Sequence, residues 1–137
     1  SKSPNGFESR HAQRVLEILK EHDGKFPDYA FPVQVIRLGQ KLTLVALGDE
    51  TVIDYSLRLK RELAKNGELV WVAGYSNLVT CYVPSQRVLI EGGYEAAGAM
   101  IYTSLPGMFA EDVEERILAS VHRQAAALAK SGKTGAE

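Results

Sequence analysis

Three short apolar segments constrain the fold of this chain more than any other feature. They read VQVIRLG (33–39), LTLVALG (42–48) and LVWVAGY (69–75). Their β-branched and aromatic residues predict β-strands. The short GQK connection between the first two favours an antiparallel hairpin. The third is wholly apolar, which is typical of a strand in a sheet that is covered on both faces.

Three other segments have the periodicity of amphipathic helices. They run from about Glu8 to Glu21, from Thr51 to about Lys65, and from about Ala110 onward, and a further short helix is expected near Ser85–Glu91. Helices alternating with strands in this order predict an α/β fold, a layered domain with a small mixed sheet flanked by helices.

The length of 137 residues fits a single domain over 1–137, with flexible ends at about 1–6 and 130–137. Lys and Arg total 16 against 17 Asp and Glu, so charge gives no basis for binding nucleic acid. No apolar stretch is long enough to cross a bilayer, and no signal-peptide pattern is present. The single cysteine, Cys81, excludes an internal disulfide and a four-thiolate zinc site.

Polar residues follow two of the predicted strands. Glu50 comes directly after Gly48 and Asp49, and the loop Asn77–Tyr82 follows the third strand. In α/β sheets, ligands bind beyond the carboxyl ends of the strands. If the two strands are parallel neighbours, Glu50 and this loop converge on one edge of the sheet.

Local pattern alone leaves structural explanations open for these residues. Glu50 fits a helix N-terminus, where a carboxylate gains about 0.3–1 kcal/mol. Tyr82 and Tyr94 fit core aromatics whose hydroxyl groups reach the surface. The three histidines lack the spacing of metal ligands and fit solvated surface positions; they are His11, His22 and His122.

A linked set of segments resembles the later part of the catalytic domain of neutral ceramidases, from about Phe31 to the last helix. The segments are FPVQVIRLG, ALGDETVIDYSLRLKREL, VWVAGYSNLVTCYVPSQRVLIEGGYEAAGAMIY and EERI, in this order. The resemblance implies a zinc-dependent amidohydrolase that cleaves the amide bond of N-acyl sphingosine lipids.

The resemblance also implies site residues. In the family, zinc is held by two histidines, one glutamate and one tyrosine. The glutamate precedes an RRLR-like helix, which matches Glu50 before LRLKREL. The tyrosine ends an Asn-x-x-x-x-Tyr segment, which matches Asn77 to Tyr82. A further active-site tyrosine precedes Glu-Ala-Ala, which gives Tyr94 a catalytic role near the scissile amide.

The chain departs from the family pattern in three places. Asp49 stands where glycine is usual, Gly48 where proline is common, and Cys81 where a larger polar residue is frequent. The two histidine ligands come from His-rich segments of the family that this sequence does not contain.

We therefore expect the chain to be the C-terminal portion of a larger catalytic domain, inactive alone. An upstream part of its own longer chain would supply the remaining zinc ligands, and uncovered apolar surface would permit a homodimer. The resemblance implies that the parent protein is exported or membrane-associated. The alternatives are a free-standing, non-catalytic α/β binding or interaction module and a scaffold-only relative in which Glu50 is merely a helix cap.

Overall fold

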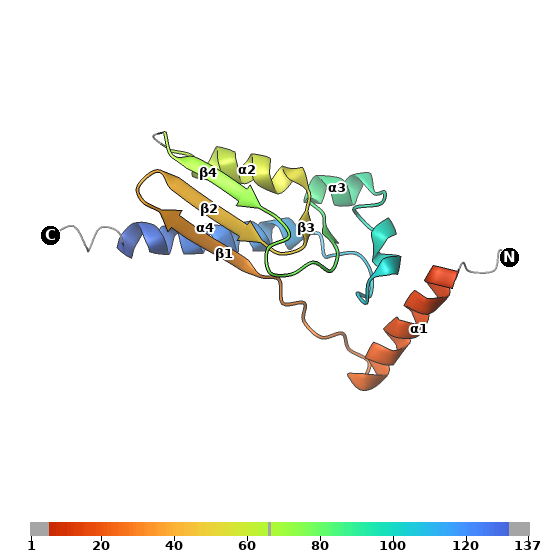
Figure 1. The fold of residues 1–137 in the computed structure, drawn as a ribbon. Coiled ribbons are helices and arrows are strands. Elements are labelled where there is room, and N and C mark those ends of the chain that lie inside the picture. The colour runs from red at the N-terminus through yellow and green to blue at the C-terminus, as the bar shows by residue number, and fades with distance from the viewer. Residues whose placement is uncertain (1–5, 66, 132–137) are drawn as a thin grey trace.

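The computed structural model describes residues 6–65 and 67–131, which form an α/β arrangement (Figure 1). The sequence-based fold class is confirmed. The elements follow one another in this order: α1 (Gly6–Glu21), β1 (Val33–Leu38), β2 (Leu42–Leu47), β3 (Glu50–Thr51), α2 (Ile53–Leu63), β4 (Leu69–Ala73), β5 (Tyr82–Val83), α3 (Gln86–Glu91), the 3-10 helix η1 (Gly98–Tyr102) and α4 (Val113–Ser131).

The strands form two small sheets. The larger has the order β1-β2-β4, in which β1 and β2 are the expected antiparallel hairpin and β2 and β4 run parallel. The smaller is a parallel pair of β3 and β5, each of two residues. Since β3 directly follows β2 and β5 follows β4, the second ladder extends beyond the carboxyl ends of the parallel strands.

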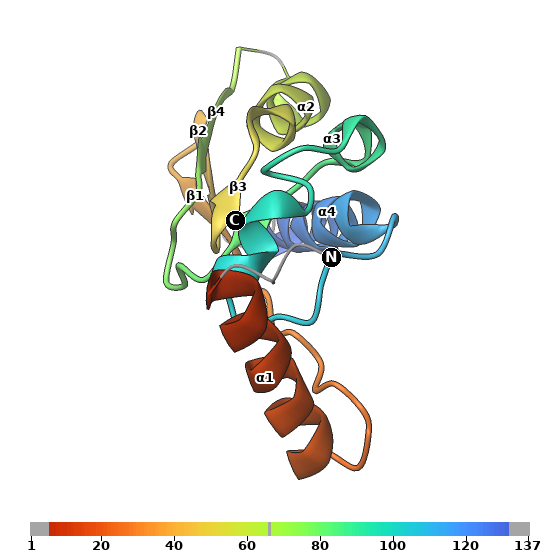
Figure 2. The ribbon, with the colours of Figure 1, turned by 90° about the vertical axis from the view of Figure 1, so that its right-hand side faces the viewer.

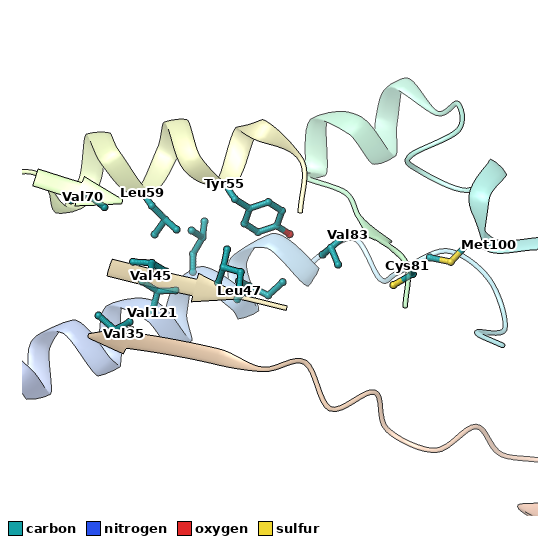
Figure 3. Packing of buried hydrophobic residues seen from close by; sticks show 12 residues of the cluster. Val35, Val45, Leu47, Tyr55, Leu59, Val70, Cys81, Val83, Met100 and Val121 are labelled. Carbon is teal, nitrogen blue, oxygen red and sulfur yellow. The ribbon is translucent and has the colours of Figure 1, made fainter. Parts of the chain in front are cut away.

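Helices α2 and α4 lie on the same side of the larger sheet (Figure 2). The core between them and the sheet contains wholly buried side chains from four elements (Figure 3). Each such residue stabilises the fold by about 1.5–3 kcal/mol relative to an exposed one. The largest of these side chains is Tyr55, whose hydroxyl donates to the Pro84 carbonyl at 3.0 Å and so ties α2 to the chain after β5.

Within the described residues the other face of the larger sheet is uncovered, whereas the apolar third strand had indicated cover on both faces. Leu69 and Trp71 on β4 are 67% and 63% exposed. The reason is that both long helices that follow the strands pack on one side, which leaves alternate residues of each strand on the other. The pairing register continues this apolar surface across the sheet. We call it the open face: Ile36, Leu38, Leu42, Leu44, Leu69 and Trp71.

Helix α1 stands apart from the rest of the molecule and contributes no buried residue (Figures 1 and 2). It contacts η1, where the rings of Phe7 and Tyr102 meet edge to face with centroids 5.1 Å apart. Among the described residues, no helix has the length and apolar character needed to span a membrane.

Some element boundaries differ from expectation. Helix α2 begins at Ile53, because Glu50 and Thr51 pair with β5 instead of joining the helix. Helix α4 begins at Val113 and not near Ala110. Of the ends expected to be flexible, 1–5 and 132–137 lie outside the described residues, whereas Gly6 and the pair 130–131 belong to helices.

Candidate functional site

The site begins at the tight turn that ends β2. Gly48 packs so closely on Pro32 that an added Cβ would lie 2.6 Å from the Pro32 Cγ. Asp49 follows with a φ of 53°, the left-handed conformation that glycine adopts most readily. The turn therefore directs the chain sharply into β3, whose first residue is Glu50.

Asp49 is the centre of a buried hydrogen-bond network. Its side chain is fully buried and accepts from the Tyr29 hydroxyl at 2.6 Å and the Thr80 N–H at 2.7 Å. Its backbone N–H donates to Leu78 O at 2.6 Å, and its carbonyl accepts from the Tyr75 N–H at 2.7 Å. Asp49 thus fixes the loop after β4 against the end of β2.

Glu50 and Tyr82 are register partners in the β3–β5 ladder. The Glu50 N–H donates to Cys81 O at 3.0 Å, which sets the two side chains side by side. The helix-cap explanation for Glu50 is wrong, because the N-cap of α2 is Val52 and no side chain caps it. Glu50 lies in a strand, two residues before that position.

Two phenols interact with the Glu50 carboxylate. A side-chain hydrogen bond to Glu50, aided by burial, raises the pKa of Tyr82. The same kind of bond raises the pKa of Tyr75 to about 12. Glu50 therefore favours the protonated form of both phenols, and a nearby positive charge would be needed to favour a phenolate.

Tyr94 lies next to Tyr82. The two rings meet edge to face with centroids 5.5 Å apart, and Tyr102 lies 6.5 Å beyond Tyr94. Tyr94 is 51% exposed, so it is not a core aromatic. A pocket of about 200 Å³ is lined by Glu50 and these three tyrosines, among others. The structure thus brings together all three residues that the sequence singled out.

A second pocket, of about 460 Å³, shares Glu50 and Tyr82 with the first. Its one arginine, Arg87, is paired with Asp54 at 3.0 Å and with Glu91 at 2.6 Å. A separate pocket of about 440 Å³ lies between the segment before β1 and α4, and its lining includes none of the three predicted site residues.

The donor chemistry fits part of a zinc site. A carboxylate and a phenol lie together, and both are oxygen ligands suited to a divalent cation once the phenol has lost its proton. Within residues 6–65 and 67–131, no group of three or more His, Cys, Asp or Glu side chains is arranged to hold a metal ion. Glu50 and Tyr82 therefore make up half of a site at most.

The remaining candidate ligands have other partners. His11 Nδ1 lies 3.2 Å from the Thr103 carbonyl oxygen, and His122 Nε2 lies 2.7 Å from the Glu62 carboxylate. Both rings are only partly buried, and the His122 side chain is 42% exposed, so they lie at the surface as predicted, each with a hydrogen-bond partner. Burial raises the pKa of the Cys81 thiol to about 11, so the thiol is a poor nucleophile and a poor ligand.

Sequence reasoning missed Tyr75 and the reason for Asn77. Tyr75 directly follows Gly74 at the end of β4, and that position after a parallel strand was the available signal. Asn77 is exposed and has a φ of 68°, a conformation that asparagine tolerates better than most residues. Its place in the motif is thus explained by the shape of the loop.

Comparison of the chain with models of protein families, with curated proteins and with solved structures finds no match.

Proposed function

We propose that this chain is the C-terminal portion of a zinc-dependent, ceramidase-like amidohydrolase that cleaves N-acyl sphingosine lipids. The observation that carries the proposal is the cluster of Glu50, Tyr82 and Tyr94 at the β3–β5 ladder. The resemblance assigned roles to these three residues from sequence alone, and in the structure all three line one pocket.

The left-handed turn at Asp49 also supports the proposal. The family's usual glycine at this position is the residue that adopts such a φ most readily. In this chain Asp49 adopts it instead, and its side chain compensates by accepting hydrogen bonds from Tyr29 and Thr80. The substitution therefore preserves the position of Glu50.

In the proposed enzyme, Glu50 and Tyr82 would hold zinc together with two histidines from an upstream part of the same polypeptide. Bound zinc supplies a Lewis acid that lowers the pKa of water and polarises the amide carbonyl. The Tyr94 hydroxyl donates a hydrogen bond to the amide carbonyl oxygen of the substrate, which gains negative charge in the transition state. A ring in contact with Tyr82 is well placed for that role.

The open face is the docking surface for that upstream part. With strands about 4.8 Å apart and a rise of about 3.3 Å per residue, three strands present a face of about 15 Å by 17 Å. The area of this face falls well short of the roughly 800 Å² per partner that a stable dimer buries. A segment of the same polypeptide needs less area, because its association loses little translational freedom.

The second candidate function is that of a non-catalytic binding or interaction module. The open face favours it, since exposed apolar patches mark interaction sites. In that case the same face would bind another protein or a second copy of the chain, and Glu50 would need no metal.

The test is hydrolysis of N-acyl sphingosine by the protein at its natural length, expressed in its source cells. Release of the free sphingoid base is measured by mass spectrometry for the wild type, for Glu50→Gln and for the exposed control Glu111→Gln. We expect activity in the wild type and the control, and none in Glu50→Gln. A wild type without activity, or an active Glu50→Gln variant, would overturn the proposal.

A further inference from the structure

A pocket of about 280 Å³ lies where α1 meets η1 (Figure 2). We call it the basic pocket, because its lining from α1 includes Arg10, His11 and Arg14. No carboxylate of the described residues lines it, whereas each of the three other pockets described above has at least one. Since the whole chain has a net charge of -1, this positive charge is a local feature, and it is suited to an anion.

The wall that carries these basic side chains is held in place by specific contacts. The rings of Phe7 and Tyr102 meet edge to face, and His11 Nδ1 lies 3.2 Å from the Thr103 carbonyl oxygen. Thr103 is itself fixed, since its hydroxyl donates to Met100 O at 2.9 Å. The basic pocket is therefore shaped by contacts between α1 and η1 and not by one helix alone.

Both arginines can bind an anion without losing a strong contact. The Arg10 guanidinium lies over the Phe7 ring, 4.5 Å from its centroid. A stacked guanidinium uses its face, so the N–H donors in its plane remain available to phosphate oxygens. Arg14 pairs with Glu17 at 3.3 Å, but these side chains are 53% and 61% exposed, and an exposed pair of this kind contributes little.

A row of aromatic rings begins at the basic pocket. We call it the aromatic row: Phe7, Tyr102, Tyr94 and Tyr82, in which each ring contacts the next. The first three side chains are 50%, 57% and 51% exposed, so the row offers an apolar surface to a ligand.

The aromatic row connects two pockets of opposite charge. Tyr102 and Thr103 line both the basic pocket and the pocket that contains Glu50. An anionic amphiphile would therefore bind in one orientation, with its charged group at α1 and its alkyl chain directed along the rings toward Glu50.

We infer that the basic pocket binds the phosphate group of an amphiphilic lipid whose alkyl chain lies along the aromatic row. Arg10 and Arg14 are one helical turn apart, so both can reach the same group. A phosphate suits two guanidinium groups better than a carboxylate does, because it has more charge and more acceptor oxygens. The inference does not depend on zinc or on amide hydrolysis.

The experiment is isothermal titration calorimetry of the natural-length protein with three probes, below the concentrations at which the amphiphiles form micelles. Octyl phosphate has both the anion and the chain, octyl glucoside has the chain alone, and inorganic phosphate has the anion alone. We expect octyl phosphate to bind at least about 10-fold more tightly than either other probe, because only it uses both the arginines and the rings.

Variants of α1 provide the matched control. The double variant Arg10→Gln, Arg14→Gln should bind octyl phosphate about 10–100-fold more weakly and no better than octyl glucoside. Arg14→Gln alone, which leaves the stacking of Arg10 on Phe7 intact, should lose about 5–10-fold. Lys20→Gln removes a charge from the same helix outside the pocket and should change the affinity by less than about 2-fold.

Four results would overturn the inference. They are a wild type that does not bind octyl phosphate, arginine variants that bind it as tightly as the wild type, octyl glucoside bound as tightly as octyl phosphate, and a Lys20→Gln loss as large as that of the arginine variants. Inorganic phosphate bound as tightly as octyl phosphate would contradict the lipid assignment, because the rings would then contribute nothing. None of these readouts involves hydrolysis, so failure of the proposed function would be seen separately.

Discussion

Glu50 and Tyr82 are opposite each other in the parallel pairing of β3 with β5. A carboxylate and a phenol from two separate strands are therefore held side by side by backbone pairing, and not by side-chain packing alone. Rigid placement of this kind is what a metal or catalytic site requires. The predictions below all concern the protein at its natural length.

Tyr94→Phe should lower kcat about 10²–10³-fold, the usual loss on removing one oxyanion donor. The KM should change little, because the ring and its contact with Tyr82 remain. Steady-state hydrolysis of N-acyl sphingosine measures both constants. An unchanged kcat would remove Tyr94 from the mechanism.

Asp49→Ala should destabilise the protein by about 2–4 kcal/mol, because the part-buried Tyr29 hydroxyl and Thr80 N–H both lose their acceptor. Tyr29→Phe removes only one of these bonds and should cost about 1 kcal/mol. Urea denaturation measures both free energies of unfolding. If Asp49→Ala cost no more than Tyr29→Phe, Asp49 would not be the centre of the network.

Gly48→Ala should destabilise the turn by about 1–3 kcal/mol through overpacking against the Pro32 ring. Gly107→Ala is the control, since no atom lies within 4 Å of its added Cβ. The same denaturation experiment compares the two. Equal stability of both variants would show that Pro32 moves aside without cost.

Arg58 should make stability depend on pH. Its guanidinium lies 2.8 Å from Glu62, 3.0 Å from Glu114 and 2.5 Å from Glu115. Hydrogen bonding from Arg58 lowers the pKa of Glu115. Burial of Glu62 acts to raise its pKa, but hydrogen bonds from Arg58 and His122 outweigh burial and lower it.

The pKa values of Glu62 and Glu115 are lower in the folded protein than in the unfolded chain. The stabilisation that these two ionised carboxylates contribute is therefore complete above pH 4.5, their ordinary pKa, and is lost as the pH falls through their folded-state pKa values. Arg58→Met should flatten this acid-side loss and destabilise the protein by about 2 kcal/mol at pH 7, because Glu114 is left buried without its cation. Lys60→Met, on the exposed side of α2, should leave the pH profile unchanged.

Substitution of Trp71 tests what covers the open face. If an upstream part of the polypeptide packs there, Trp71→Lys should lower the free energy of unfolding by at least about 2 kcal/mol, because the charge of the lysine would be buried. Ile90→Lys, at a position 80% exposed on α3, should cost less than about 0.5 kcal/mol. Equal, small effects would show that the open face faces solvent. A dimer that Trp71→Lys dissociates in sedimentation would assign the face to a second copy.

The fold was predictable from the sequence where local pattern and tertiary structure agree. The hairpin follows from two β-branched segments with a short connection, and the convergence of Glu50 with Tyr82 follows from the parallel pairing of β2 and β4. The exposure of Trp71 was not predictable, because an apolar strand has the same sequence pattern whether one or both faces of its sheet are covered.

The site was predictable only in part for a similar reason. Residue type and position after a strand drew attention to Glu50, while the ligand role proposed for it and the roles proposed for Tyr82 and Tyr94 come from the resemblance. The role of Asp49 depends on Tyr29, a partner distant in sequence whose contact no local pattern encodes. Thr51, the first residue of an expected helix, joins Glu50 in strand β3 instead, since pairing with β5 satisfies backbone groups that the helix would have left free.

Native mass spectrometry of the protein isolated from its source cells tests the central claim most directly, because it reports chain length and bound metal together. The account predicts a chain longer than 137 residues that carries one zinc ion, which is lost in Glu50→Gln. A metal-free chain, or one whose zinc is retained without Glu50, would contradict it.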